Sequence, residues 1–293
     1  MKLALIGGGM VGQCYAQAFA ASGAQICGIA DAHPPEVLYM LARALGTPVH
    51  TTGGAWLADA DVVVSAVFGA AAREVATAAL GQMRAGALFV DMTTADPEDM
   101  VRANNQAIAS GHHFVDVAIT GAVNIHGAKT PLLCAGERAG EVATLYRSIG
   151  SPIQIVGARP GDAASLKLLR SIFTKGLEAL SVECLTTAER RGLRSQLHDI
   201  LSDVDKGSLR AQMESMVCTH IEHSARRRKE VAEAQRQMRM AGIDPLVLPA
   251  VESLFERTAT RQACMPYQGK SIEAALQWLL DASAQPAGAP ANA

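Results

Sequence analysis

The amino-acid sequence predicts an α/β domain followed by an all-helical domain. Up to about residue 158, short apolar segments alternate with amphipathic ones, and beyond that point strand signals almost disappear. Continuous apolar strands that alternate with helices are typical of a parallel sheet covered on both faces. With 293 residues, of which 49% are hydrophobic, the chain is long enough for two domains and a sizeable core. We expect domains at residues 1–158 and 159–282, and a disordered Ala/Pro-rich tail at 283–293.

The expected elements of the first domain follow from apolar runs and the residues that interrupt them. The segment 34–46, for example, begins with two prolines and ends with a glycine, as helices commonly do. Strands are expected at residues 3–6, 25–31, 61–67, 87–92, 113–119, 130–136 and 152–156. Helices are expected after the first strand as far as residue 21, and at 34–46, 70–80, 97–111 and 137–150.

The second domain is expected to begin with one long helix between the domains, at residues 159–191. Leucines and aromatic residues recur there at helical spacing, and Gly176 is the only interruption. Three cations, Lys167, Arg170 and Lys175, are unusual in a helix that otherwise resembles part of a core. Further helices are expected at 201–216, 219–242, 245–259 and 271–282.

Composition excludes several classes of protein. The formal net charge of −2 gives no electrostatic case for nucleic-acid binding. No apolar run has membrane-spanning length and no signal-peptide pattern opens the chain, so we expect a cytoplasmic protein without a membrane partner. The six cysteines are scattered without a C-x-x-C pair, which favours reduced thiols. His220 and His223 are spaced like two metal ligands, but a third is not evident, so no metal is expected.

Gly7, Gly9 and Gly12 have the spacing G-x-G-x-x-G between an expected strand and an expected helix. In that context the pattern predicts a dinucleotide-binding turn of Rossmann-like type. The first glycine permits the tight turn, the second lets a pyrophosphate approach the backbone, and the third lets helix and strand pack closely. The free N–H groups at the helix N-terminus attract the phosphates. The alternative is a glycine-rich turn without a ligand.

Asp31 ends the second expected strand, nineteen residues after Gly12. A carboxylate there can accept hydrogen bonds from the ribose hydroxyls of adenosine and repels a 2′-phosphate. The alternative interpretation makes Asp31 a helix cap before Pro34 and Pro35. We expect NAD as the cofactor, with NADP as the second choice.

Five segments, in the same order, resemble motifs of the β-hydroxyacid dehydrogenases, which include 3-hydroxyisobutyrate dehydrogenase and 6-phosphogluconate dehydrogenase. They are GGGMVG, DVVVSAVFGAAAREV, DMTTADP, DVAITGAVNIHGAKTPLLCAG and GDAASLKLLRS, and a fainter match, RKEVAEAQRQMRMAG, lies in the helical part. The resemblance implies a small carboxylate substrate and a homodimer formed through the helical domains. It also implies cofactor contacts from Gly7, Gly9, Met10, Val11, Gly12, Asp31, Val67, Phe68, Thr94 and Lys229.

Lys167 stands where the resembling family carries its catalytic lysine. By the same resemblance, the substrate is held by Thr120, Gly121 and Ala122, and we add Arg170 and Ser171 because they lie three and four residues after Lys167 on the same helix. The chain departs from the family pattern at Ala122, which replaces a glycine, and at Arg170 and Ser171, which replace two asparagines. These departures indicate a divergent branch rather than a 3-hydroxyisobutyrate or 6-phosphogluconate enzyme.

The expected reaction is hydride transfer between a nicotinamide and a small hydroxy acid, or its keto or semialdehyde form. Oxidation of an alcohol needs a base for the hydroxyl proton, and a lysine whose pKa is lowered by burial can provide it. The alternatives are that Lys167 faces water beside the apolar stripe and that Arg170 pairs with Glu178. Two other functions stay open: a reductase of imines or other substrates on the same scaffold, and a dinucleotide-binding sensor without turnover. Lys167 argues against the imine reductases, because they lack the catalytic lysine.

Overall fold

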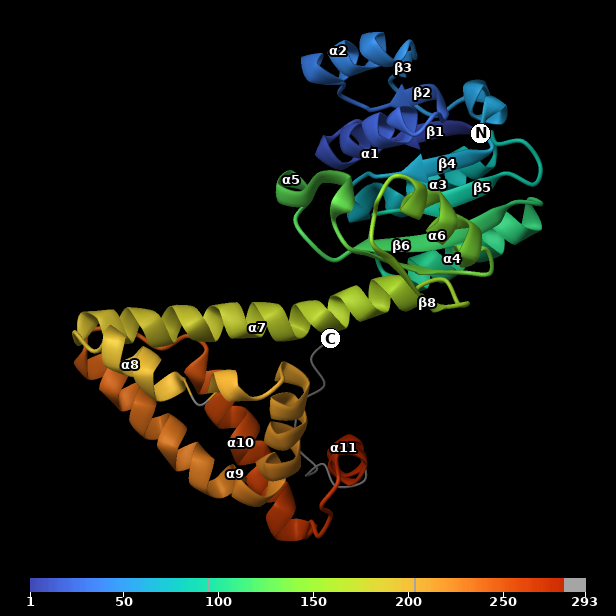
Figure 1. Cartoon of the computed structure of the whole chain (residues 1–293). Coiled ribbons are helices and arrows are strands. Elements are labelled where there is room, and N and C mark those ends of the chain that lie inside the picture. The colour runs from blue at the N-terminus through green and yellow to red at the C-terminus, as the bar shows by residue number, and fades with distance from the viewer. Residues whose placement is uncertain (94, 203, 282–293) are drawn as a thin grey trace. The chain divides into compact units, whose positions relative to one another are not determined.

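The computed structural model describes residues 1–93, 95–202 and 204–281, so the tail expected at 283–293 lies outside the described residues (Figure 1). The chain forms two compact units, Met1–Ile172 and Phe173–Ala293. Helix α7 (Asp162–Arg190) begins in the first unit and continues into the second. An α/β unit followed by a helical unit is the predicted fold class, which is confirmed.

The first unit is built on an eight-stranded sheet with the order β3-β2-β1-β4-β5-β6-β7-β8. Neighbouring strands are parallel except for β6 and β7, which pair antiparallel. The order reverses between β1 and β4, so the chain winds outward in both directions from this point, as in doubly wound nucleotide-binding folds. The strands are β1 (Lys2–Ile6), β2 (Gln25–Ala30), β3 (Val49–His50), β4 (Val62–Ser65), β5 (Leu88–Asp91), β6 (His113–Ile119), β7 (Leu132–Ala135) and β8 (Ile153–Gly157).

Helices cover both faces of this sheet, as the continuous apolar strands predict. One buried cluster joins the sheet to α1, α2 and α6, where Tyr15, Phe19 and Tyr146 pack ring against ring. A second cluster joins the other face to α3 and α4. The helices of the first unit are α1 (Met10–Ala21), α2 (Glu36–Leu45), α3 (Gly69–Leu80), α4 (Pro97–Ala109), α5 (Val123–His126) and α6 (Ala139–Ser148), with 3-10 turns η1 (Ala55–Asp59) and η2 (Gly127–Lys129).

Three features of the sheet were not predicted. The short strand β3 and the turn η1 lack the long apolar runs that mark the other elements. The antiparallel direction of β7 follows from its connection, since only α5 and η2 lie between β6 and β7. A parallel crossover usually carries a full helix, and this connection, residues 120–131, holds only the four-residue α5 and the turn η2.

The second unit is helical. Two segments expected as separate helices, 201–216 and 219–242, instead share one helix, α9 (Leu209–Met240), whose first turn is capped by Ser208 Oγ accepting from Ala211 N at 3.2 Å. Its other elements are the C-terminal part of α7, α8 (Arg194–Leu201), η3 (Val204–Lys206), α10 (Leu248–Cys264) and α11 (Ile272–Leu280). Among the described residues, no helix is both long and apolar enough to cross a membrane.

Buried contacts hold these helices together. Ile221 of α9 packs with Ala275 and Trp278 of α11 in one apolar cluster. The buried carboxylate of Glu183 on α7 accepts hydrogen bonds from the backbone at the start of α10, including Val247 N at 2.6 Å. Because a helix N-terminus carries free N–H groups and a partial positive charge, this carboxylate caps α10 from another helix.

Candidate active site

The turn after β1 is shaped by two glycines that exclude side chains. Gly7 has φ +101°, a left-handed conformation that side chains disfavour, and a Cβ there would lie 2.5 Å from the Ala66 carbonyl oxygen. A Cβ on Gly12, in the first turns of α1, would lie 1.8 Å from the Gly7 carbonyl oxygen. Gly9 has open space where its side chain would be. The backbone of this turn is therefore tightly packed at Gly7 and Gly12 and open at Gly9, where a pyrophosphate can approach it.

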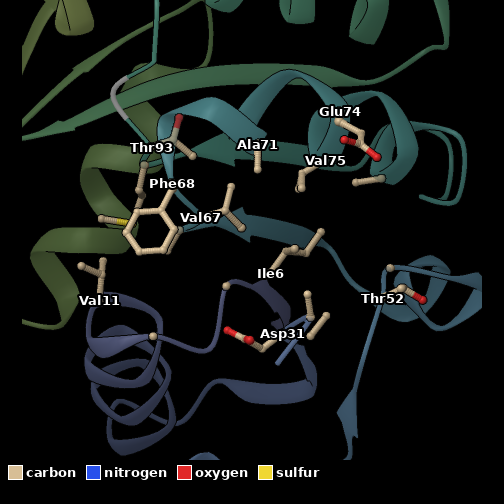
Figure 2. Close-up of a pocket in the computed structure, with 18 of the residues that line it drawn as sticks. Ile6, Val11, Asp31, Thr52, Val67, Phe68, Ala71, Glu74, Val75 and Thr93 are labelled. Atoms are coloured by element: carbon tan, nitrogen blue, oxygen red, sulfur yellow. The ribbon is translucent and has the colours of Figure 1, made fainter. Parts of the chain in front are cut away.

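A cavity of about 820 Å³ lies beside this turn, within the usual size range of ligand pockets. Figure 2 shows Val11, Phe68 and Thr93 at one end of it and Thr52 and Glu74 at the other. Its walls come from the carboxyl ends of β1, β2 and β4 and from one side of α3, and they are largely apolar. An elongated cavity at the point where the strand order reverses is the place where such folds bind a dinucleotide.

Asp31 lines this cavity between its two ends (Figure 2) and is anchored by the backbone. Its Oδ2 accepts from Gly8 N at 2.7 Å and its Oδ1 accepts from His33 N at 2.8 Å. The carboxylate thus ties the end of β2 to the glycine turn, and each oxygen keeps a further lone pair for a ribose hydroxyl. It does not cap α2, because the N-cap position of that helix is Pro35.

Val67 and Phe68, which are predicted for the nicotinamide half, lie toward one end of the cavity together with two residues of the glycine motif. Met10 and Val11 come from the first turn of α1, and Val67 and Phe68 follow β4. Phe68 is 89% exposed at the N-cap of α3, so its ring is available to cover a ligand. Thr94 lies outside the described residues. Its neighbour Thr93, which the sequence reasoning missed, lines the cavity.

Lys167 lies where this cavity meets a second one of about 510 Å³. Burial lowers the pKa of the lysine from its ordinary value, and the charge of Asp116 acts in the opposite direction. The residues common to both cavities are Met10, Val11, Ile119 and Lys167. A titratable amine at this junction can reach a proton on a small molecule that lies next to the nicotinamide end.

The predicted substrate residues divide into two groups. Thr120, Gly121, Ala122 and Arg170 line the second cavity together with Asn124, which the sequence reasoning missed. Ser171 does not line either cavity: its hydroxyl donates to the Lys167 carbonyl oxygen at 3.0 Å, within the helix.

Two of these side chains differ from expectation in their partners. The Thr120 hydroxyl donates to the Pro131 carbonyl oxygen at 2.9 Å, which leaves it as an acceptor only. Arg170 is exposed, and Glu178, its suggested partner, pairs instead with Lys175 at 2.7 Å. The sequence does contain a signal for Asn124: it follows the substrate motif by two positions and carries an amide that can bind a polar group.

Lys229 lies on α9, in the second unit, and its side chain is exposed. The structure does not position it relative to the cavities. His220, considered as a metal ligand, has its Nε2 2.8 Å from the Thr258 hydroxyl. Among the described residues, no group of three or more metal-ligating side chains is found.

The sheet order and the glycine turn define a nucleotide-binding α/β protein. Residues 2–156 match the family model of the NAD binding domain of 6-phosphogluconate dehydrogenase, and the chain belongs to this family. Residues 188–258 match a second family model, a domain of unknown function. The predicted membership of a divergent branch and the predicted nicotinamide dinucleotide cofactor are both confirmed at the level of the family.

Three similar proteins indicate how divergent this branch is. An uncharacterized 28.5 kDa protein from Methanothermus fervidus is 27% identical over 216 residues, which cover 74% of this chain and 83% of the relative. A solved structure of a conserved protein of unknown function, described as similar to 3-hydroxyacid dehydrogenases, is 28% identical, with a TM-score of 0.62 and coverage of 89% and 97%. A variant imine reductase from Myxococcus stipitatus, in complex with NAD+, has a TM-score of 0.73 at 19% identity and coverage of 95% and 99%. At that identity the likeness shows the fold alone.

Proposed function

We propose that the chain is an NAD(P)-dependent oxidoreductase that interconverts a small hydroxy acid and its keto or semialdehyde form. The position of Lys167, which lines both the dinucleotide-sized cavity and the smaller one, carries this proposal. Interconversion of an alcohol and a carbonyl requires a proton carrier next to the carbon that exchanges the hydride. Lysine is suited to this role when burial lowers its pKa, as it does here.

The residues present fit a dinucleotide, since the glycine turn leaves its backbone open above Gly9. The N–H groups at the start of α1 would hold the pyrophosphate, and Asp31 would accept hydrogen bonds from the adenosine ribose. The negative charge of Asp31 supports NAD over NADP. Met10, Val11, Val67 and Phe68 would surround the nicotinamide, which supplies or accepts the hydride when bound.

Lys167 Nζ would move the proton. In oxidation, the neutral amine takes the hydroxyl proton as the hydride leaves carbon. In reduction, the ammonium donates that proton to the developing alkoxide. Both directions use the same atom, so the protonation state of Lys167 decides which direction is faster at a given pH.

The second cavity would hold the carboxylate of the substrate. Arg170 can bind a carboxylate through two parallel N–H donors, and the amide of Asn124 can donate a third hydrogen bond. The family's glycine is Ala122 here and the hydroxyl of Thr120 is already donated, so both contribute less than the motif implies. We therefore assign recognition of the acid group chiefly to Arg170.

Turnover by purified full-length protein across a panel of hydroxy acids and keto acids tests this proposal. Lys167→Ala is expected to lower kcat by about 10²–10⁴-fold while the affinity for NAD stays within a few-fold. Lys175→Ala is the matched control, because Lys175 is on the same helix and pairs with Glu178 on the surface. Turnover that is indifferent to Lys167→Ala would contradict the mechanism.

Two rival functions have distinct outcomes in the same assays. A sensor binds NAD tightly without turnover on any substrate, and the internal hydrogen bonds of Thr120 and Ser171 are the observations that favour it. An imine reductase reduces an imine to an amine with a hydride from the nicotinamide and a proton, and the fold-level likeness to such enzymes is its support.

We also propose that the protein is cytoplasmic and that Lys229 contacts the cofactor. We further propose a homodimer in which residues 159–282 supply the dimer contacts. Large apolar side chains that are exposed on the second unit support the dimer, among them Ile200 and Leu246. Light scattering coupled to size-exclusion chromatography measures the mass of the particle and therefore its oligomeric state. A monomer at micromolar concentration would contradict it.

A further inference from the structure

Three polar residues form a buried row at the carboxyl ends of neighbouring strands. Ser65 on β4 pairs in register with Asp91 on β5, and Asp91 pairs with Asp116 on β6. All three are 0% exposed. Register partners in a parallel sheet point to the same face, and two residues earlier Phe89 and Phe114 confirm this by stacking with their centroids 5.8 Å apart. The two carboxyl groups are therefore neighbours on one face.

Each carboxyl group has one satisfied oxygen and one that lacks a partner. Asp91 Oδ1 accepts from Thr93 N at 2.7 Å and from the Thr93 hydroxyl. Asp116 Oδ2 accepts from Gly161 N at 3.1 Å and from Ala164 N at 2.9 Å. Asp91 Oδ2, Asp116 Oδ1 and Ser65 Oγ are buried without a hydrogen-bond partner among the described residues. Buried polar atoms are rarely left so, because each unsatisfied group costs free energy.

A proton shared by Asp91 and Asp116 would satisfy the two unpaired carboxyl oxygens and would remove the repulsion between two negative charges. Two ionised carboxylates side by side in a dry environment repel each other, and one of them normally retains a proton. A proton on one orphaned oxygen can be donated to the other, so each oxygen gains a partner. We propose that Asp91 and Asp116 hold one proton between Asp91 Oδ2 and Asp116 Oδ1, and that the remaining negative charge anchors the first turn of α7 and favours the protonated form of Lys167.

The electrostatics of the surroundings agree with this assignment. Burial raises the pKa of Asp91 and of Asp116 to about 6 each, and the charge of Asp91 adds to the effect on Asp116. The facing cation is Lys167 on α7, and Ser65 on β4 is neutral. Cys134 on β7 interacts with Asp116 as well, but burial raises the pKa of its thiol to about 11, so it stays neutral.

The negative charge belongs mainly to Asp116, because the two backbone N–H donors and Lys167 all stabilise its ionised form. Those donors belong to the start of α7, where the partial positive charge of the helix favours an anion. Lys167 follows Ala164 by one turn, so Asp116 fixes the segment that carries the lysine. Asp91 is connected to the dinucleotide cavity through Thr93, which lines it. Both carboxyls are positioning residues, since neither of them lines either of the two cavities described above.

The pair can be tested without any substrate. Side-chain ¹³C NMR titration of the wild-type carboxyls is expected to show one group that stays protonated to near-neutral pH, in two coupled steps. In Asp91→Asn the remaining carboxyl of Asp116 is expected to titrate about one pH unit lower than the upper step of the pair, because the neighbouring charge is gone. Asp99→Asn, which removes a partly buried carboxylate that pairs with Arg102, is the matched control and should leave both steps in place. Two carboxyls that are fully ionised at pH 5 in the wild type, or that titrate independently, would overturn the proposal.

The effect on Lys167 rests on the proposed function and has its own measurement. Lysines labelled by reductive ¹³C-methylation report their pKa by NMR, and Lys167→Arg identifies the signal. Asp116→Asn is expected to shift the Lys167 titration to lower pH, by about one unit, and Asp99→Asn is expected to leave it unchanged. A Lys167 titration that does not move contradicts the link between the pair and the lysine. Failure of Lys167→Ala to affect turnover removes the proposed function but leaves the carboxyl titrations standing.

Discussion

Gly12 packs so closely against Gly7 that a single methyl group on it would overlap the Gly7 carbonyl oxygen, at 1.8 Å. The obstacle is backbone rather than a flexible side chain, so the turn itself must move to admit any substitution. The dinucleotide site thus depends on a contact between two residues that have no side chains.

Gly12→Ala is expected to weaken NAD binding at least about 10-fold and to destabilise the fold by about 1–3 kcal/mol, since overpacking displaces the turn. Titration of NAD by fluorescence and urea denaturation measure the two effects. Gly140→Ala in α6 is the control: nothing lies within 4 Å of its Cβ position, so stability should rise slightly, as alanine favours helices. NAD affinity unchanged in Gly12→Ala would contradict the assignment of the turn.

Asp31→Asn is expected to weaken NAD binding and to narrow the preference for NAD over NADP. The amide keeps one acceptor for Gly8 N or His33 N but not for both, and it no longer repels a 2′-phosphate. The ratio of the two dissociation constants, measured in one buffer, is the readout. A ratio that matches the wild type would show that other residues determine the choice.

The pH dependence of the free energy of unfolding should contain a contribution from the lowered pKa of Lys167. Burial lowers its pKa in the folded state, so between that pKa and the ordinary value of 10.5 the unfolded chain binds more protons than the folded one. Stability therefore gains a contribution that rises with pH over this window. In Lys167→Met this rise is expected to disappear, which urea denaturation at several alkaline pH values would show. If the free energy of unfolding rises equally with pH in the wild type and in Lys167→Met, the lysine is solvated rather than buried.

Arg170→Gln is expected to raise KM for a carboxylate substrate about 10-fold or more and to change kcat much less, because a bidentate contact to the acid group holds substrate and transition state alike. Arg190→Gln, an exposed arginine at the end of the same helix, serves as the control. A loss confined to kcat would instead assign Arg170 to the chemical step.

The sequence predicted the elements that rest on strong local patterns. The glycine spacing and the position of Asp31 can be recognised from a few adjacent residues. These two signals therefore located the part of the first cavity that lies beside the turn after β1. Thr93 was missed because pattern alone does not determine which residues after a strand face a ligand.

The buried row of Ser65, Asp91 and Asp116 could not be predicted, because it depends on which strands are neighbours. Each residue on its own resembles an ordinary polar end of a strand. The direction of β7 and the continuity of α9 were missed for a similar reason: both are decided by packing partners far away in the sequence.

Helix α7 passes from the first compact unit into the second without a break, and Gly176 lies shortly after the boundary at residue 172. No neighbour occupies the space where its side chain would be, so packing does not require a glycine there. Glycine in a helix interior costs roughly 1 kcal/mol relative to alanine, and its lack of a Cβ makes the backbone easier to bend. We expect Gly176 to act as a hinge, so that Gly176→Ala stiffens the helix and narrows the distance distribution between spin labels on the two units. If that distribution stays unchanged, the glycine has no mechanical role. If it narrows, one methyl group is enough to set the stiffness of α7.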